Sequence, residues 1–267
     1  MKRINYKNKV VVITGASSGI GLALSRELIL KHGARVYAVA RGEERLQKAR
    51  EELGENYLPY KMDAGKKESW VEIKNYLAKK EGKIDVLINC AGVLPEFKSY
   101  ESVEENELEG ALAINLYAQL YSTKELLPII NQGGAIINIS SASALCPFGG
   151  ITTYALTKSA SSAFTESLAC ELKGISASAV LPGFVKTDIM KNQELKGRES
   201  KIIAFFSARA EVCARKILRR ARRRRRKIIV GKDAHLMSFL YKLAPNCAPR
   251  IITRFLKKSG LKLFSKI

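Results

Sequence analysis

Short apolar runs alternate along this chain with stretches in which apolar residues recur at helical spacing. The apolar runs predict buried strands at residues 9–14, 35–40, 84–90, 134–140, 176–183 and 227–231. The helical spacing covers residues 20–32, 43–53, 68–80, 102–127, 154–173 and 207–223. Continuous Val/Ile strands that alternate with helices are typical of a parallel sheet with both faces covered. The pattern therefore predicts one doubly wound α/β domain.

Two further apolar segments follow the last predicted strand. Residues 234–245 are apolar but too few to span a bilayer, which takes roughly 18 residues. In residues 250–267 the apolar and basic positions both follow a helical period, on roughly opposite faces. Such a helix lies in the interface of an anionic membrane, and the alternative is a helix docked on the domain or on a partner subunit. We therefore divide the chain into a domain at residues 1–232 and a helical extension at residues 233–267.

Positive charge is concentrated toward the C-terminus. Residues 1–190 hold 23 Lys or Arg and 21 Asp or Glu, whereas residues 191–267 hold 23 and 4. Residues 220–227, the arginine run, have seven basic residues in eight positions. This asymmetry indicates an anionic partner. The run has no interleaved aromatic residues and the chain shows no nucleic-acid-binding fold, which favours a membrane surface over a specific nucleic acid.

The arginine run begins on a predicted helix and ends at a predicted strand. Within residues 207–223 the apolar positions 210, 214, 217, 218 and 221 fall on one helical face. The same spacing places Arg215, Arg219, Arg222 and Arg223 toward solvent. Cations near the C-terminal end of a helix also suit its dipole. We therefore expect a solvated helix end that lies outside the chemistry.

Cysteine and histidine usage argues against a disulfide framework and against a metal site. The five cysteines are odd in number and widely spaced, and none forms a C-x-x-C pair. His32 and His235 are the only histidines, and neither lies near other candidate ligands. The basic N-terminus is followed by too short an apolar run for a signal peptide. We therefore expect a reducing compartment, the cytoplasm, with attachment to the cytoplasmic face of a membrane as a further option.

A glycine-rich turn, TGASSGIG, joins the first predicted strand to the first predicted helix. Its three glycines permit a tight turn and close backbone approach at the start of the helix. The unpaired N–H groups there can hold a pyrophosphate. The alternative is an ordinary β-to-α turn without a ligand. The residues that we expect at a dinucleotide are Gly15, Ser17, Ser18, Gly19, Ile20 and Gly21.

The end of the second predicted strand bears on the choice between NAD and NADP. A carboxylate at this point would bind the adenosine ribose of NAD, whereas an arginine suits the additional phosphate of NADP. The chain has Ala40 followed by Arg41, and Glu43 and Glu44 fit the first turn of the next helix. We therefore expect NADP(H) rather than NAD. The alternative is that Arg41 is a solvated loop residue.

Tyr154 and Lys158 are four residues apart, which places them on one face of a helix. A phenol with a pKa near 10 is a poor base at neutral pH, and a nearby ammonium favours the phenolate. Lowering the pKa by about 3 units corresponds to about 4 kcal/mol. Tyr154 would then exchange a proton with a carbonyl or alcohol. The spacing alone is weak evidence, because any exposed helix face can hold it by chance.

Six motifs occur in order along residues 10 to 190. They are TGASSGIG at 14–21, NCAG at 89–92, Asn115 in INLYA, NISS at 138–141, YALTK at 154–158 and PGFVKT at 182–187. With these motifs the chain resembles the short-chain dehydrogenase/reductase family. The resemblance implies a Rossmann-like fold and hydride transfer between a nicotinamide and the carbonyl or alcohol carbon of a small molecule.

The resemblance implies a role for each catalytic residue. Tyr154 corresponds to the general acid/base, and Lys158 lowers its pKa and holds the nicotinamide ribose. Ser141, thirteen residues before Tyr154, corresponds to the residue that hydrogen-bonds the substrate oxygen, whereas Ser140 has the wrong spacing. Asn115 corresponds to the helix residue whose backbone carbonyl anchors a water in a proton relay to Lys158.

The resemblance also implies further contacts with the cofactor. Asp63 corresponds to the residue at the adenine ring, with a helix N-cap as the alternative role. Asn89, Ala91, Gly92, Pro182, Gly183 and Thr187 line the cofactor cleft, with Thr187 at the nicotinamide carboxamide. The chain departs from the family in Cys90, which replaces the second Asn of the usual NNAG. We expect Cys90 to be a small buried apolar residue without a role.

Residues 188–206 follow the PG turn, in the segment that sets substrate choice in the family. Their apolar side chains could form a lid over a long apolar substrate, and the alternative is that they close the core. The candidate lid residues are Ile189, Met190, Ile202, Ile203, Phe205 and Phe206. The basic end with its apolar helices resembles reductases of lipid-like substrates, including ketosphinganine reductases.

These patterns leave two classes of function. The first is an NADP(H)-dependent reductase of a hydrophobic ketone, and the resemblance implies a homo-oligomer formed through helices at 102–127 and 154–173. The second is a non-catalytic basic protein that binds nucleic acid or a membrane surface on the same scaffold. The intact Ser141, Tyr154 and Lys158 favour the enzyme.

Overall fold

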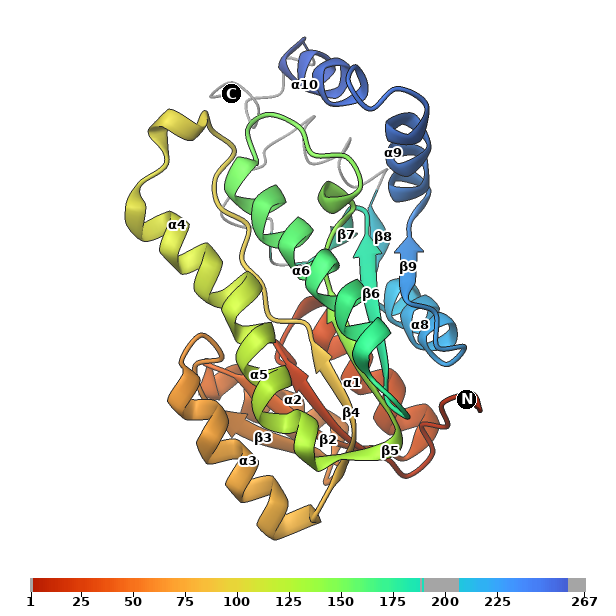
Figure 1. The fold of residues 1–267 in the computed structure, drawn as a ribbon. Helices are drawn as coiled ribbons and strands as arrows, with labels where there is room; N and C mark the ends of the chain where they lie inside the picture. Colours follow the sequence, from red (N-terminus) through yellow and green to blue (C-terminus); the bar gives the residue numbers. More distant parts are fainter. Residues whose placement is uncertain (1, 188, 190–206, 259–267) are drawn as a thin grey trace.

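The computed structural model describes residues 2–187, 189 and 207–258. Its main sheet is wholly parallel, with seven strands in the order β3-β2-β1-β4-β5-β6-β9, and helices cover both faces (Figure 1). This arrangement confirms the predicted Rossmann-like doubly wound sheet, in a single domain with C-terminal helices.

The strands follow the apolar runs closely. They are β1 Val10–Thr14, β2 Arg35–Ala40, β3 Tyr57–Lys61, β4 Ile84–Asn89, β5 Ile130–Ile139, β6 Ser176–Pro182 and β9 Lys227–Val230. Successive side chains point to opposite faces of a strand. Val11 and Ile13 of β1 belong to one core cluster, whereas Val12 belongs to the other. Both faces of the sheet are buried, which explains why the strands read as continuous apolar runs.

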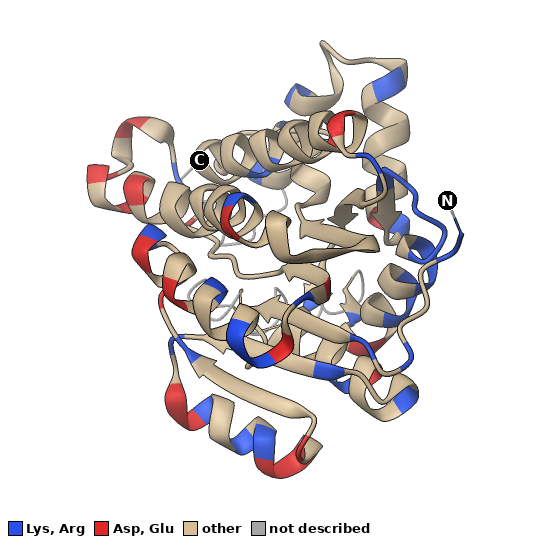
Figure 2. Ribbon diagram, turned by 60° about the horizontal axis from the view of Figure 1, so that its bottom comes forward, with Lys and Arg blue, Asp and Glu red and all other residues tan. Residues whose placement is uncertain are grey.

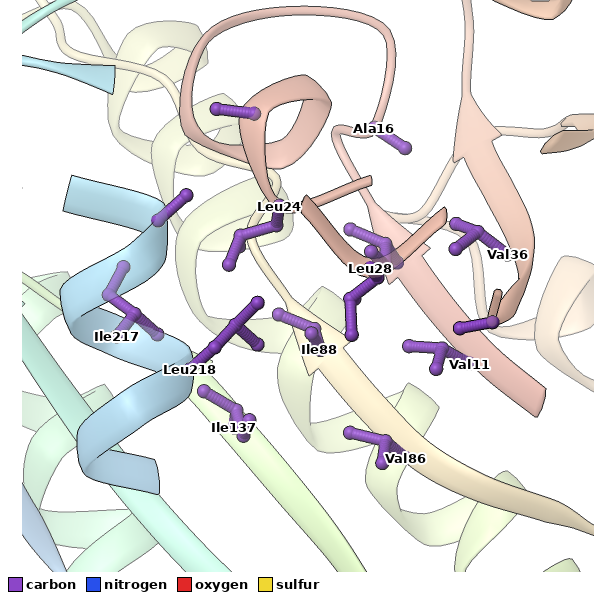
Figure 3. Close-up of a cluster of buried hydrophobic side chains, with 14 of the residues drawn as sticks. Val11, Ala16, Leu24, Leu28, Val36, Val86, Ile88, Ile137, Ile217 and Leu218 are labelled. Atoms are coloured by element: carbon purple, nitrogen blue, oxygen red, sulfur yellow. The ribbon is translucent and has the colours of Figure 1, made fainter. Parts of the chain in front are cut away.

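Three helices pack on each face of the sheet. One face carries α1 Gly19–His32, α2 Glu43–Leu53 and α8 Ala210–Ala221, and the other carries α3 Lys67–Glu81, α5 Ala118–Leu126 and α6 Thr152–Glu171. Figure 3 shows Leu28 of α1 and Leu218 of α8 directed toward Ile88 of β4. All five predicted apolar positions of α8 are buried, and the four arginines predicted to face solvent are exposed.

Two parts of the sheet and its helices differ from the predicted pattern. Strand β3 was not predicted, because its sequence YLPYK contains Pro59 and lacks a continuous apolar run. It lies at the edge of the sheet, where proline is tolerated and one face is exposed. The single helix predicted at 102–127 is interrupted. It consists of η1 Tyr100–Ser102, α4 Glu105–Leu112, the π-helical segment η2 Ala113–Tyr117, α5 and η3 Leu127–Ile129.

The arginine run lies at the end of the sheet where the strands begin, near the N-terminus of the chain (Figures 1 and 2). Arg224 donates hydrogen bonds to the backbone oxygens of Lys2, Gly133 and Gly134 at 2.6–3.1 Å, and to Ser176 Oγ at 3.0 Å. Arg220 donates to the backbone oxygen of Ile229. The run is therefore partly structural rather than only solvated, because these guanidinium groups satisfy carbonyls where strands and loops meet.

Two helices follow β9 at the carboxyl end of the sheet, opposite to the end where the arginine run lies. They are α9 Lys232–Leu243 and α10 Ala248–Lys258 (Figure 1). The amphipathic helix predicted from residue 250 thus begins at Ala248, and residues 259–267 lie outside the described part. Shorter elements complete the order: η4 Ala142–Ala144, β7 Val185–Lys186 and β8 Ala208–Arg209. Over the residues that the structure describes, no helix is both long enough and apolar enough to cross a membrane.

Candidate active site

A cleft of about 350 Å³ lies at the carboxyl ends of the central strands, where the chain order passes from β1 to β2 on one side and to β4 on the other. Ligands of open α/β sheets bind at this switch point. Most of the predicted site residues line the cleft: Gly15, Ser18, Gly19, Ile20, Gly21, Arg41, Ala91, Gly92, Ser141, Tyr154, Lys158, Pro182, Gly183 and Thr187. Ser17 and Asp63 line an adjoining pocket together with Arg41.

The glycine-rich turn delivers the N-terminus of α1 to this cleft. A Cβ atom on Gly21 would lie 2.2 Å from the backbone oxygen of Gly15, so no other residue fits there without a shift of the backbone. The side chain of the N-cap residue Ser18 makes no capping hydrogen bond. Leu22 N–H is bonded to Ser18 O at 3.0 Å, and the N–H groups before it have no acceptor within the helix. These donors and the helix dipole suit an anionic group.

Thr14 holds the glycine-rich turn against the end of β4, a role that the sequence patterns did not reveal. Its Oγ1 accepts hydrogen bonds from the N–H groups of Cys90 at 2.9 Å and Ala91 at 3.0 Å. The side chain is buried. A polar residue at the end of an otherwise apolar buried strand was the available signal, because buried hydroxyl groups need partners.

Asn89 does not line the cleft, contrary to the prediction. Its side chain is buried behind the strands, where its Nδ2 donates to Asn138 Oδ1 at 2.9 Å and its Oδ1 accepts from Ser122 at 2.8 Å. Asn138 Nδ2 in turn donates to Thr165 of α6 at 2.8 Å. This network ties β4 and β5 to the helices on one face, so Asn89 supports the cleft from behind.

Cys90 is half-buried at the floor of the cleft and packs against the main core cluster. Burial raises the pKa of its thiol to about 12, and the nearby Lys158 ammonium opposes this shift only in part. The thiol is therefore neutral and unreactive at physiological pH. Within the described residues, no three His, Cys, Asp or Glu side chains gather as metal ligands would.

Two arginines stand at the end of the cleft that follows β2. Arg41 and Arg45 both line it and both are exposed. Glu43 and Glu44 lie in the first turn of α2, as predicted, and Glu43 pairs with Lys61 at 2.7 Å outside the lining. Arg45 was missed, because only the folded helix turns a residue four positions after Arg41 toward the same pocket. Positive charge thus dominates this end of the cleft.

Asp63 lies at the same end, in the loop after β3. Its Oδ1 accepts a hydrogen bond from Gly65 N–H at 3.0 Å and turns the loop back toward the pocket. Helix α3 begins at Lys67 with Lys66 as its N-cap, so the alternative N-cap role for Asp63 is wrong. Asp63 lines the pocket that also includes Arg41 and Ile114.

Ser141, Tyr154 and Lys158 come together on the opposite side of the cleft. Lys158 Nζ lies 5.7 Å from the centre of the Tyr154 ring and donates a hydrogen bond to Ile139 O at 3.1 Å. The Ser141 and Tyr154 side chains are hydrogen-bonded to each other. Ser141 Oγ also accepts from Ser143 N–H at 3.2 Å, which leaves its proton available for donation toward the phenol. These contacts place a hydroxyl, a phenol and an ammonium within one site.

Ser140 is directed away from this group, in agreement with the spacing argument. Its hydroxyl is buried and donates to the backbone oxygen of Lys158 at 2.6 Å. It therefore holds α6 against the end of β5. Two consecutive serines thus have separate tasks, because successive side chains of an extended chain point to opposite sides.

The pKa values of Tyr154 and Lys158 differ from the sequence-based expectation. Burial raises the pKa of the Tyr154 phenol, and the hydrogen bond from Ser141 only partly opposes the rise. Burial also lowers the pKa of the Lys158 ammonium to about 8. The predicted lowering of the tyrosine pKa by lysine is therefore wrong for the protein alone, because desolvation of the buried phenol dominates. Tyr154 is a neutral phenol at physiological pH.

Asn115 lies in the π-helical segment between α4 and α5, and its side chain is fully buried. Its Nδ2 donates to Val93 O at 3.0 Å and to Thr157 Oγ1 at 3.2 Å, and its Oδ1 accepts from Val93 N–H at 2.8 Å. The side chain thus locks the loop after β4 to α6 beside Lys158. Single π-turns inside helices frequently occur at functional sites. The predicted role of its backbone carbonyl remains a prediction.

An apolar pocket opens beside Tyr154 and Ser141. It is lined mainly by Leu94, Phe97, Ala142, Phe148, Ile151, Pro182, Phe184, Val185, Ile189 and Met237. Asp233 of α9 also borders it, but its Oδ2 accepts a hydrogen bond from Phe184 N–H at 2.6 Å. Of the predicted lid, Ile189 reaches this pocket, and the remainder, at 188 and 190–206, lies outside the described residues.

The curated proteins that are similar to this chain include three bacterial dehydrogenases or reductases. An uncharacterized short-chain type dehydrogenase/reductase y4vI from Sinorhizobium fredii is 31% identical over 192 residues, which are 71% of this chain and 35% of that protein. A 3beta-hydroxysteroid dehydrogenase from Mediterraneibacter gnavus is 31% identical, with 74% of this chain and 75% of that protein covered. An NADP-dependent 3-hydroxy acid dehydrogenase YdfG from Salmonella typhi is 30% identical, with 72% and 79% covered.

A solved structure matches the fold over nearly the whole chain. A short chain dehydrogenase/reductase from Burkholderia phymatum in complex with NAD has a TM-score of 0.82 at 20% identity, covering 91% of this chain and 95% of that chain. The family described as short chain dehydrogenase matches residues 9–197, which is more than two thirds of this chain. The chain therefore belongs to the short-chain dehydrogenase/reductase family, whose members are oxidoreductases acting on CH–OH and C=O groups.

Proposed function

We propose that this chain is an NADP(H)-dependent reductase of a hydrophobic, lipid-like ketone, with Tyr154 as the general acid. The observation that carries the proposal is the position of Ser141, Tyr154 and Lys158. They lie between a cleft that suits a dinucleotide and a pocket that is mainly apolar. A proton donor is thus within reach of both.

The cleft fits a nicotinamide dinucleotide. The uncapped N-terminus of α1 would hold the pyrophosphate, and the glycine at position 21 lets the backbone approach it closely. Asp63 would contact the adenine, Thr187 the nicotinamide carboxamide, and Lys158 the nicotinamide ribose. When bound, the reduced cofactor supplies the hydride that is added to the carbonyl carbon.

Arg41 and Arg45 support NADP(H) over NAD. The two guanidinium groups form a basic end of the cleft beside the expected adenosine ribose, where an additional phosphate would be bound. The neighbouring carboxylate of Glu43 is paired with Lys61. One of the relatives is named as NADP-dependent, which agrees with this choice.

The raised pKa of Tyr154 supports the direction of reduction. A neutral phenol can donate its proton to the carbonyl oxygen as negative charge develops there, and Ser141 can donate a hydrogen bond to the same oxygen. The Lys158 ammonium stabilises the phenolate that remains. The backbone carbonyl of Asn115 would anchor a water through which the proton is replaced.

The substrate class follows from the pocket beside Tyr154. Ten of its lining residues are apolar, and the Asp233 carboxylate is occupied by a backbone N–H group. One relative is named as a 3beta-hydroxysteroid dehydrogenase, a name that specifies an apolar substrate. The pocket has a volume of about 100 Å³, and its lining suits the part of a hydrocarbon chain or ring that is next to the ketone carbonyl.

We also propose a setting for the reaction. A homo-oligomer that associates at an anionic membrane surface would meet an apolar ketone where it dissolves, and the basic C-terminal end supports such a surface. The comparisons lend no support to the alternative of a non-catalytic basic binding protein.

The proposal is tested by NADPH oxidation with methyl ketones of increasing chain length, for the wild type and for Tyr154→Phe. We expect kcat/KM to rise with chain length, by up to about fourfold for each methylene buried. Tyr154→Phe should lose at least about 100-fold in turnover. Full turnover in this variant, or no binding of NADPH by the wild type, would contradict the proposal. A flat response to chain length would overturn the substrate class.

A further inference from the structure

Helices α9 and α10 expose an unusual amount of apolar surface. Among the described residues, twelve large apolar or aromatic side chains are exposed, and half of them lie on these two short helices. They are Leu236, Phe239, Leu240, Leu243, Ile251 and Phe255, with exposed fractions of 37% to 71%. The other six are spread over the remainder of the chain. Clustered exposure of this kind marks an interaction surface, whereas scattered apolar residues are normal.

The four apolar side chains of α9 follow a helical period along its outer face. The opposite face holds the buried Ala234 and Ser238. In α10 the buried Ala248 faces the domain, and Gly149 N–H is bonded to Thr253 Oγ1 at 2.9 Å. Both helices are thus fixed to the domain on one side and expose apolar side chains on the other, where none of the described residues covers them.

Helices α9 and α10 also carry a large excess of positive charge. Residues 232–258 contain six Lys or Arg and a single acidic residue, Asp233, whose carboxylate is directed inward. The cations are Lys232, Lys242, Arg250, Arg254, Lys257 and Lys258, all exposed, and none has an ion-pair partner within the described part of the chain. Helices that expose apolar side chains, and whose exposed cations have no ion-pair partner among the described residues, are complementary to an anionic lipid surface.

The same helices border the site. Met237, on the inner side of α9, lines the apolar pocket beside Tyr154. Arg250, Arg254 and Lys257 of α10 line a neighbouring groove of about 680 Å³ between α10 and α6. Phe148 lines both the groove and the pocket. A surface that docks through α9 and α10 is therefore next to the entrance for an apolar substrate.

We propose that the outer faces of α9 and α10 form the surface by which this protein docks on an anionic bilayer, with the substrate pocket opening toward the lipid. The inference rests on the proposed function for the identity of the substrate, but the docking itself does not. An anionic bilayer accounts for both features, because it accepts the apolar side chains and neutralises the cations.

A second copy of the chain fits this surface less well. A two-fold interface brings the same residues of both subunits together. It would therefore bring the cations of α9 and α10 in one subunit close to those in the other, and like charges in an interface are unfavourable. The charge thus selects the lipid surface as the occupant.

Flotation with lipid vesicles tests the docking without any substrate. Vesicles of phosphatidylcholine containing phosphatidylserine should bind the wild-type protein at least tenfold more than vesicles of phosphatidylcholine alone. Leu236→Ser/Phe239→Ser and Arg250→Glu/Arg254→Glu should each reduce binding at least tenfold. For the arginine variant the reason is that each lost cation near the surface contributes about 1 kcal/mol. The matched controls, Leu30→Ser and Arg223→Glu/Arg225→Glu, change exposed residues elsewhere and should bind as the wild type does.

Two results of this experiment would overturn the assignment of the docking surface to α9 and α10. Equal loss in the Arg223→Glu/Arg225→Glu control would overturn the assignment to α9 and α10, since general charge would then explain binding. Unchanged binding by both α9–α10 variants would also overturn it. A smaller oligomer for Leu236→Ser/Phe239→Ser in size-exclusion chromatography, without vesicle binding by the wild type, would identify a second copy as the occupant. NADPH titration without vesicles, run in parallel, separates failure of docking from failure of the proposed enzyme.

Discussion

Both ends of the parallel sheet carry dense positive charge, and the chain uses it in two different ways. Where the strands begin, Arg224 of the arginine run is half-buried and bonded to four oxygen atoms of the chain. Where the strands end, Arg41 is exposed at the end of a cleft. Lys158 is buried there with a backbone carbonyl as its acceptor. A guanidinium group that is bonded to several oxygens of its own chain holds the fold, whereas an exposed guanidinium group at the cleft remains available to a ligand.

This contrast corrects the first impression given by the sequence. The arginine run is the densest cluster of charge, but it lies where the strands of the sheet begin, away from the site. The residues that we assign to chemistry are isolated in the sequence and meet only at the carboxyl ends of the strands. Local charge density therefore predicts function less well than the partners that each side chain finds.

The largest effect separates two neighbouring serines at the carboxyl end of the sheet. Ser141→Ala should lower turnover about 100-fold to 1000-fold, because a donor to the developing oxyanion is lost. Ser140→Ala removes a buried bond to the backbone of Lys158 and should lower the free energy of unfolding by about 1 kcal/mol instead. Steady-state kinetics and urea denaturation of both variants check the pair. A greater loss of turnover in Ser140→Ala would reverse the assignment.

The next effect concerns the buried cation at the site. Lys158 has a pKa of about 8 in the folded protein and 10.5 as its ordinary value. Between these pH values the unfolded chain holds more protons, so stability rises with pH. The free energy of unfolding of the wild type relative to Lys158→Met should therefore increase by about 3 kcal/mol from pH 7 to pH 10. Urea denaturation across this range measures it, and a difference independent of pH would refute the shift.

A smaller loss of stability is expected at the other end of the sheet. Arg224→Ala leaves three backbone carbonyls and one hydroxyl without their donor and should lower the free energy of unfolding by about 2 kcal/mol. Arg225→Ala, an exposed neighbour in the arginine run, should change it by less than about 0.5 kcal/mol. Thermal and urea denaturation compare the two variants. Equal values would show that the run acts only as general charge.

The smallest of these effects is in cofactor binding. Arg41→Ala should weaken NADPH binding about tenfold to thirtyfold through the loss of a charge-assisted bond, and should leave NADH binding nearly unchanged. Arg45→Ala should act in the same direction. Fluorescence titration with each cofactor measures both constants. Parallel losses for NADPH and NADH would remove the argument for an NADP preference.

The sequence predicts the parts of the fold that are decided locally. Buried strands are continuous apolar runs, and the glycine-rich turn has fixed spacing, so both were placed within a few residues. Strand β3 was not predicted, because an edge strand needs no continuous apolar run and tolerates Pro59. The π-helical segment around Asn115 was not predicted either, and the bonds of Asn115 to Val93 and Thr157 join it to other parts of the chain that no local pattern specifies.

The residues of the site also divide into those that the sequence predicts and those that depend on distant segments. Ser141, Tyr154 and Lys158 were identified through ordered motifs that resemble those of the family. Arg45, Met237 and the contact of Asp233 with Phe184 depend on how distant segments close on the cleft, which no local pattern specifies. The predicted direction of the Tyr154 pKa shift is wrong for that reason, because the burial that raises the pKa is supplied by many elements at once.

The most direct test of the contrast between the two ends of the sheet is an NADPH titration of Arg41→Ala and Arg224→Ala, made alongside the wild type under conditions where all three are folded. The account predicts at least a tenfold weaker NADPH affinity for Arg41→Ala and an unchanged affinity for Arg224→Ala. Wild-type affinity in Arg41→Ala together with a clear loss in Arg224→Ala would contradict it.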